Sequence, residues 1–335
     1  MNYKFEFPAI FLIGPTASGK TELSLSIAKE FPVEIISVDS AMVYKDLDIG
    51  TSKPSKNIRE SYNHHLIDIL SPEQDFDLGF FLEETAKALK NIRAKNKLPL
   101  FVGGSMLFHK TLLEGIHNFP NDINVRKDIA ALNKSKGLEG MSKELKNTDP
   151  ETYQKIDIKN ARRVERALEI IRITGKKLSQ LKTEPKDMFF DQSKCLLLGI
   201  SDKKNKLEDL ANIRLLKMLD NGLINELENL KKEYRLSSEL QSMNSINYKQ
   251  FLPYINGVIS LDAAFNDALV ATKQLIKTQL NWMKKFELNY CANTEDINDS
   301  KVFSDTITTY LRSFDKWIGI QMKMILGAKK MVLRI

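Results

Sequence analysis

The sequence predicts an α/β fold: a parallel sheet flanked by helices and interrupted by a helical insertion. Short apolar runs alternate with amphipathic segments through the first third of the chain, the order typical of a parallel sheet. A glycine-rich loop follows the first apolar run directly. Between about residues 120 and 185 the strand signal disappears, and the sequence is charged and helical.

The first predicted strand covers residues 8–13 and leads into a complete G-x-x-x-x-G-K-[ST] phosphate-binding loop. A helix over about 20–30 follows and adds its positive N-terminal end. The glycines let the backbone curl so that several N–H groups face one anion. We expect Lys20 to reach the outer phosphate and the Thr21 hydroxyl to bind Mg²⁺. The loop therefore predicts a diphosphate or triphosphate ligand, bound by Gly14, Pro15, Thr16, Ala17, Ser18, Gly19, Lys20 and Thr21.

Two further strands also end in polar residues. Residues 33–38 lead into Asp39, and residues 98–102 lead into Gly103-Gly104-Ser105. In parallel sheets ligands bind at the carboxyl ends of strands, so we expect Asp39 and Ser105 to converge with the phosphate loop. Asp39 could hold a metal, act as a general base or only cap a helix. Ser105 could donate to a phosphate oxygen or only cap the next helix.

The second half of the chain is mostly helical. A returning strand over 195–200 precedes helices over about 207–219, 223–232 and 261–286. We therefore expect a discontinuous core of residues 1–119 and 191–290, a helical insertion at 120–190, and a tail of uncertain structure at 291–335, with a possible helix over 302–314.

An arginine row marks the insertion. Arg162, Arg163 and Arg166 lie off the apolar face of an amphipathic helix, a spacing that suits contacts to nucleic-acid phosphates. The alternative is a solvated face on which Glu165 and Glu169 pair with these arginines.

The composition agrees with an ordinary globular protein. The 335 residues are 42% hydrophobic and 28% charged, and no apolar stretch approaches the length of a membrane span. Two cysteines predict neither a disulfide framework nor a metal cluster. We expect a cytoplasmic protein without a membrane partner. The net charge of +7 is compatible with a polyanionic partner.

Ten ordered sequence blocks resemble the tRNA dimethylallyltransferase family, which modifies an adenosine beside the anticodon. The blocks are the phosphate loop, Asp39-Ser40 through Tyr44 with Asp48-Ile49-Gly50-Thr51, His64-His65-Leu66-Ile67-Asp68, Gly103-Gly104-Ser105, Asp149-Pro150-Glu151-Thr152, Arg163 with Arg166 to Glu169, Thr174-Gly175-Lys176, Arg214 with Met218 and Gly222-Leu223, Tyr248-Lys249-Gln250, and Ala271-Thr272-Lys273-Gln274-Leu275.

The resemblance implies a P-loop NTPase-like core that transfers dimethylallyl from its diphosphate to the exocyclic N6 amine of the adenosine 3′-adjacent to the anticodon, with Mg²⁺. It implies that Asp39 is the base, that Ser105 contacts the diphosphate side, and that Lys20 and Arg214 stabilise the leaving diphosphate. The insertion would grip the tRNA anticodon stem-loop, and we expect a monomer. The implied tRNA-binding residues are Asp39, Ser40, Ala41, Met42, Ser105, Arg126, Arg162, Arg163 and Arg166.

The chain departs from the family pattern at several positions. Leu210 stands where a second arginine is common, and Lys203 or Lys206 could substitute for it. Ser105 replaces the common Thr but keeps the hydroxyl, and Asn247 replaces a usual Gly.

Three other functions fit parts of the sequence. They are an adenylate isopentenyltransferase that uses free AMP, a small-molecule P-loop kinase that uses ATP, and a non-enzymatic RNA-binding module. The loop alone predicts nucleotide or ATP binding, but the other blocks favour dimethylallyl diphosphate as its ligand.

Overall fold

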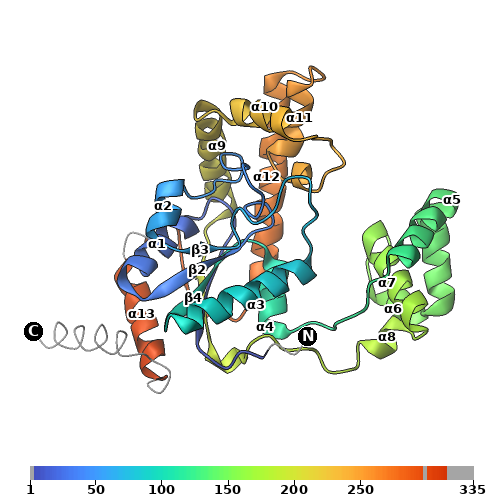
Figure 1. The fold of residues 1–335 in the computed structure, drawn as a ribbon, viewed down its shortest axis with the longest axis horizontal. Helices are drawn as coiled ribbons and strands as arrows, with labels where there is room; N and C mark the ends of the chain where they lie inside the picture. Colours follow the sequence, from blue (N-terminus) through green and yellow to red (C-terminus); the bar gives the residue numbers. More distant parts are fainter. Residues whose placement is uncertain (1–3, 297–299, 315–335) are drawn as a thin grey trace, which may run out of the picture. The chain divides into compact units, whose positions relative to one another are not determined.

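The computed structural model describes residues 4–296 and 300–314 and divides into two compact units (Figure 1). The larger unit combines Phe5–Leu113 with the described residues of Phe190–Ile335. The smaller unit contains Glu114–Phe189.

A six-stranded sheet forms the centre of the larger unit, in the order β3-β2-β4-β1-β5-β6, and all of its strand pairs are parallel. The parallel α/β fold expected from the sequence is confirmed. Every residue of β1 and β2 is buried, as expected for a sheet covered on both faces, and all are apolar except Glu34 and Ser37 of β2. The strands are β1 (Ala9–Ile13), β2 (Val33–Val38), β3 (His64–His65), β4 (Leu98–Gly103), β5 (Cys195–Ile200) and β6 (Tyr290–Ala292).

The side chains of each strand alternate between the two faces of the sheet, so both faces carry apolar side chains and helices cover both. On one face, Ile10 and Leu12 pack with α1 (Lys20–Glu30) and α13 (Ser300–Arg312). On the other, Phe11 stacks on Phe101 and meets His109 of α4 (Met106–Glu114) edge to face. The other helices of the larger unit that precede residue 114 are α2 (Lys56–Ser61) and α3 (Leu78–Ala94).

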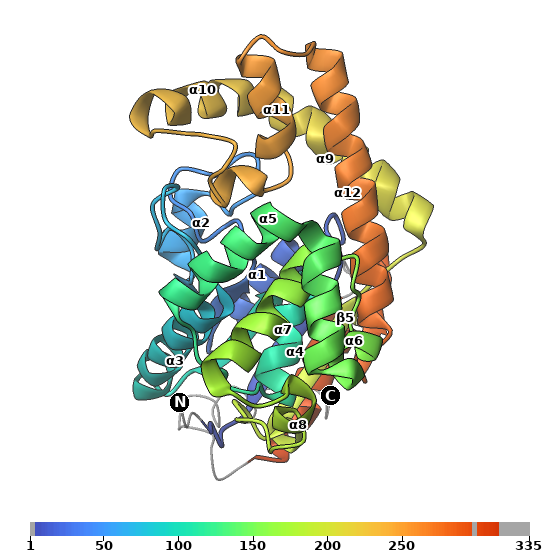
Figure 2. The same ribbon diagram turned by 90° about the vertical axis from the view of Figure 1, so that its right-hand side faces the viewer.

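Four α-helices lie between β5 and β6, and two of them pack against the phosphate loop. Helix α9 packs beside the long helix α12 (Figure 2), and Leu207, Ala211 and Ile276 form a cluster against which Ala17 of the loop packs. The four helices are α9 (Lys204–Asp220), α10 (Leu223–Glu233), α11 (Tyr248–Ile255) and α12 (Leu261–Met283).

The described part of the predicted tail belongs to the sheet and the apolar core of the larger unit. Strand β6 extends the sheet beside β5, and Phe303, Ile307 and Leu311 of α13 are buried in the sheet core. The sequence analysis left this region uncertain because a three-residue edge strand has no recognisable period. Predictions for residues 315–335 lie outside the described residues.

The smaller unit is a helical bundle with its own apolar core. Val164, Ala167 and Leu168 pack there against Met141 and Leu145. Its first helix bends at Gly137, where φ is +63°. The helices are α5 (Ile123–Thr148), α6 (Pro150–Lys155), α7 (Ala161–Thr174) and α8 (Leu178–Leu181). Across both units, none of the described helices is long and apolar enough to cross a membrane.

Candidate functional site

The carboxyl ends of four neighbouring strands lie in one row of the sheet. The register pairs Val38 with Gly103, Gly103 with Ile13, and Ile13 with Gly199. The loops that begin at Asp39, Gly104 and Gly14 therefore start side by side. They pack closely, since a Cβ added at Gly103 would lie 2.0 Å from the Val38 carbonyl oxygen.

The phosphate loop has the expected anion-binding shape. Gly19 adopts φ +82° at the N-cap of α1, a conformation that favours glycine. The Lys20 ammonium lies over the loop and donates to the Pro15 carbonyl oxygen at 2.5 Å and to Ser18 Oγ at 3.4 Å. The positive N-terminal end of α1 and this ammonium thus lie at the same loop, an arrangement suited to a phosphate.

A second cation reaches the loop from α9. Arg214 donates to Thr16 Oγ1 at 2.5 Å. Burial and the neighbouring Arg214 lower the pKa of Lys20 to about 7, while Asp39 and Glu22 act in the opposite direction. Burial also lowers the pKa of Arg214, again opposed by Asp39 and Glu22. Two closely spaced, partly desolvated cations favour a ligand that carries several negative charges.

Of the three roles considered for Asp39 in the sequence, the structure shows the capping role, and one carboxylate oxygen stays outside the cap. Its Oδ1 accepts hydrogen bonds from the amides of Ala41 at 2.8 Å and Met42 at 3.2 Å, so the carboxylate caps the following turn. No hydrogen-bond donor of the described residues reaches Oδ2. One oxygen therefore fixes the side chain, and the other is available to a substrate.

Ser105 starts α4 through its backbone. Its amide donates to the Val38 carbonyl oxygen at 3.2 Å, and its own carbonyl accepts from the amides of Phe108 and His109. Within the described part of the chain, no side-chain hydrogen bond involves the Ser105 hydroxyl. The backbone of Ser105 therefore lies next to the strand end that precedes Asp39.

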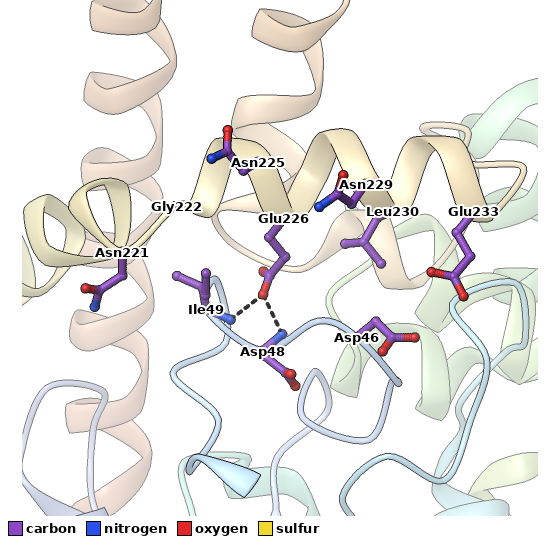
Figure 3. Close-up of a pocket in the computed structure, with 10 residues that line it drawn as sticks. All are labelled: Asp46, Asp48, Ile49, Asn221, Gly222, Asn225, Glu226, Asn229, Leu230 and Glu233. Carbon is purple, nitrogen blue, oxygen red and sulfur yellow. Dashed lines mark hydrogen bonds between the residues drawn. The ribbon is translucent and has the colours of Figure 1, made fainter.

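Glu226 of α10 anchors the loop that follows Asp39, and the sequence analysis did not identify it. Figure 3 shows its carboxylate over this loop, accepting from the amides of Asp48 at 3.1 Å and Ile49 at 2.7 Å. It also accepts from Gly50 N at 3.2 Å and from the Tyr248 hydroxyl at 2.5 Å. Beside it is a pocket of about 410 Å³ lined by Asp46, Asp48, Ile49, Asn221, Gly222, Asn225, Glu226, Asn229, Leu230 and Glu233.

Gln279 of α12 is a second residue that the sequence analysis missed. Its Oε1 accepts from the Thr16 amide at 2.8 Å, and its Nε2 donates to the Gly104 carbonyl oxygen at 3.0 Å. The side chain is 7% exposed and lies on the buried face of the helix with Ile276 and Met283. A polar amide on an otherwise apolar helix face was the available signal.

Among the described residues, no hydrogen bond or ion pair joins the phosphate loop to Lys203 or Lys206, the two lysines considered in place of the arginine missing at Leu210. Lys206 pairs with Asp202 at 2.9 Å and with Glu295 at 2.7 Å, so its charge is already neutralised. Lys203 is exposed at the start of α9. Arg214 is therefore the cation of α9 that contacts the phosphate loop.

The arginines of the smaller unit fall into two groups. Arg126 and Arg166 both pair with the buried Glu169, at 3.0 and 2.9 Å. Arg162 and Arg163 are exposed, and neither forms an ion pair with another described residue. The alternative of a solvated helix face with ion pairs therefore holds for Arg166. The charges of Arg162 and Arg163 have no ion-pair partner among the described residues.

The described residues contain no group of three or more His, Cys, Asp or Glu side chains that could hold a metal. Mg²⁺ commonly binds substrate phosphates and keeps few protein ligands. The half-buried Thr21, whose hydroxyl forms no hydrogen bond with the described residues, fits such an ion. The site therefore suits a magnesium ion carried mainly by a diphosphate.

Comparison with known proteins agrees with this arrangement. The family model described as IPP transferase matches residues 42–286. The chain is 39% identical over 277 residues to a tRNA dimethylallyltransferase of Francisella tularensis subsp. novicida, covering 82% of this chain and 90% of the relative. The chain belongs to the IPP transferase family. Membership makes it a transferase, and it confirms the resemblance found in the sequence.

Solved structures of the family are also similar. A tRNA delta(2)-isopentenylpyrophosphate transferase from Staphylococcus epidermidis is 33% identical with a TM-score of 0.64, covering 91% of this chain and 99% of that one. A eukaryotic dimethylallyltransferase acting on tRNA is 26% identical with a TM-score of 0.73, covering 87% of this chain and 74% of that one. The phosphate loop precedes the range matched by the family model, so its assignment rests on its own sequence and geometry.

Proposed function

We propose that the protein transfers the dimethylallyl group of dimethylallyl diphosphate to the N6 amine of the adenosine 3′-adjacent to the anticodon in tRNA. The observation that carries this proposal is the placement of Asp39 near the phosphate loop, where the Lys20 ammonium of the loop and the Arg214 guanidinium of α9 also lie. The loop suits a diphosphate leaving group, and Asp39 suits an attacking amine. Family membership favours this reaction over the alternatives.

The reaction forms a bond between N6 and C1 of the dimethylallyl group as the bond between C1 and the diphosphate oxygen breaks. The allylic carbon can carry positive charge, so stabilising the leaving diphosphate lowers the barrier. Loop amides, Lys20 and Arg214 face that charge. When bound at Thr21, Mg²⁺ would supply further neutralisation of the diphosphate.

Asp39 accepts the proton that N6 loses. The two amides on Oδ1 hold its carboxylate in place, which leaves Oδ2 for the amine. Ser105 contributes a hydroxyl on the same side. The adenine must leave its stack to enter such a site, as in other enzymes that modify bases.

The smaller unit would bind the anticodon stem-loop through Arg162 and Arg163, whose charges are unpaired. Arg126 and Arg166 would contribute less, because both already pair with the carboxylate of Glu169. A monomer and a cytoplasmic location stay predictions.

The decisive experiment offers labelled dimethylallyl diphosphate with tRNA and, separately, with free AMP. We expect label in tRNA only. Transfer to AMP would instead indicate an adenylate isopentenyltransferase. A parallel titration with ATP should give no turnover to ADP, and ATP hydrolysis or phosphoryl transfer would indicate a kinase.

A further inference from the structure

The side chain of Gln279 connects two loops that carry different parts of the site. Its Oε1 accepts from the Thr16 amide at 2.8 Å, in the middle of the phosphate loop. Its Nε2 donates to the Gly104 carbonyl oxygen at 3.0 Å, one residue before Ser105. The same amide group thus contacts the loop after β1 and the loop after β4.

The surroundings fix this amide in one orientation. The Thr16 N–H needs an acceptor and the Gly104 carbonyl oxygen needs a donor, and the side-chain amide supplies Oε1 to the first and Nε2 to the second. The side chain is 7% exposed, which leaves little room for water to replace it. A Cβ added at Gly104 would lie 2.4 Å from Nε2, so this position admits only a glycine while the bridge is present.

The bridge extends to Asp39 through the next residues of the β4 loop. Ser105 N donates to the Val38 carbonyl oxygen at 3.2 Å, immediately before Asp39. Gln279 therefore lies at the junction of the diphosphate side and the amine side. A displacement of about 1 Å between reacting groups can reduce a rate about 10²-fold.

We propose that Gln279 is a positioning residue that fixes the phosphate loop relative to Ser105 and Asp39, and so sets the prenyl donor against its acceptor. The part concerning the donor and acceptor rests on the proposed function. The part concerning the hydrogen-bonded connection between the two loops does not depend on the proposed function. Gln279 touches neither reactant in this role and acts through the loops.

The test compares three variants in the full-length protein. Gln279→Met removes both hydrogen bonds at similar volume. Gln279→Glu keeps an acceptor for Thr16 but removes the donor to Gly104. Gln274→Met is the matched control, because it makes the same change at an exposed glutamine of the same helix.

Hydrogen exchange of the ligand-free proteins tests the tie without any reaction. We expect Gln279→Met to accelerate exchange in both residues 14–21 and residues 103–109. Gln279→Glu should accelerate exchange in residues 103–109 only, and Gln274→Met in neither. Unchanged exchange in both segments of folded Gln279→Met would overturn the proposal. Should that variant not fold, Gln279→Glu decides in the same way, through residues 103–109.

Single-turnover prenyl transfer tests the consequence. We expect Gln279→Met to lower the rate about 10- to 100-fold, with the Kd for inorganic pyrophosphate and for tRNA within about threefold of wild type. A rate that is normal per pyrophosphate-binding site would reduce Gln279 to a stability role. If wild-type protein transfers no prenyl group, the proposed function fails, and the exchange measurements still decide whether Gln279 ties the loops.

Discussion

Arg214 donates a hydrogen bond to the hydroxyl of Thr16, although helix α9 and the phosphate loop lie 198 residues apart in the chain. This contact brings the guanidinium close to Lys20. Burial and the positive charge of this guanidinium lower the pKa of Lys20 to about 7. The free protein therefore holds Lys20 only partly protonated near neutral pH, and a polyanion between the two cations should raise that pKa again.

This linkage predicts proton uptake when pyrophosphate binds. At pH 8 most Lys20 is neutral in the free protein, so wild type should take up about one proton more than Lys20→Ala. At pH 6 Lys20 is already protonated, and the difference should vanish. Calorimetry in two buffers of different ionisation enthalpy measures it. Arg214→Gln removes one cause of the lowered pKa and should reduce the uptake at pH 8. Equal uptake by wild type and Lys20→Ala would contradict this assignment.

The same lysine should matter for the reaction. Lys20→Ala removes charge that faces the leaving diphosphate, so kcat/KM for prenyl transfer should fall about 10²-fold or more. Steady-state transfer from labelled dimethylallyl diphosphate measures this. Near wild-type transfer by Lys20→Ala would exclude the role.

The unpaired arginines of the smaller unit predict a salt effect. Replacing both Arg162 and Arg163 by Gln should weaken tRNA binding and reduce the slope of log K against log salt by about 0.9 for each lost phosphate contact. Arg172→Gln is the matched control on the same helix, because Arg172 pairs with Glu144 at 2.6 Å. Pyrophosphate affinity should stay unchanged in all variants. A slope identical to wild type in the double variant would favour a purely solvated face.

Asn247 predicts a difference between two small substitutions. It adopts φ +79°, where Gly is favourable and Ala is strained, and its side chain donates to the Gly50 carbonyl oxygen at 2.7 Å. Asn247→Ala loses the hydrogen bond and keeps the strain, so it should lower the free energy of unfolding by about 2 kcal/mol. Asn247→Gly relieves the strain and should lower it by about 1 kcal/mol or less. Denaturant unfolding measures both, and a larger loss for Gly would refute the explanation.

The sequence predicted those parts of the fold whose signal is local. The buried strands β1, β4 and β5 appear as continuous apolar runs, β2 is apolar except for Glu34 and Ser37, and the phosphate loop has a fixed spacing. The short strands β3 and β6 were missed, because two or three residues at a sheet edge show no period.

The residues of the candidate site also fall into those that the sequence can predict locally and those that depend on tertiary structure. Lys20, Asp39 and Ser105 follow strand ends, and that position is visible in the sequence. Gln279 and Glu226 act on loops that are 263 and 177 residues away in the chain, so their roles depend on tertiary structure alone. Likewise, the sequence could not show that Arg126 and Arg166 both pair with Glu169 while Arg162 stays unpaired.

The geometry of Asp39 allows its capping and catalytic roles to be separated. Oδ1 caps the turn through two amides, whereas Oδ2 has no donor among the described residues. Asp39→Asn keeps an oxygen for the cap but loses the base. The turn should therefore stay folded and tRNA affinity should stay within a few-fold, while kcat falls by about 10²–10⁴, the usual contribution of a positioned general base.

Single-turnover transfer with tRNA binding measured alongside decides between the roles of Asp39. Asp39→Ala is the companion variant, because it removes the cap as well as the base. It should lower both kcat and the free energy of unfolding, the latter by about 1 kcal/mol. Unchanged kcat in Asp39→Asn would leave Asp39 only its cap. Lost tRNA binding with intact kcat would make Asp39 a residue that recognises the adenine, because a residue that only accepts the proton contributes to the transition state and not to ground-state binding.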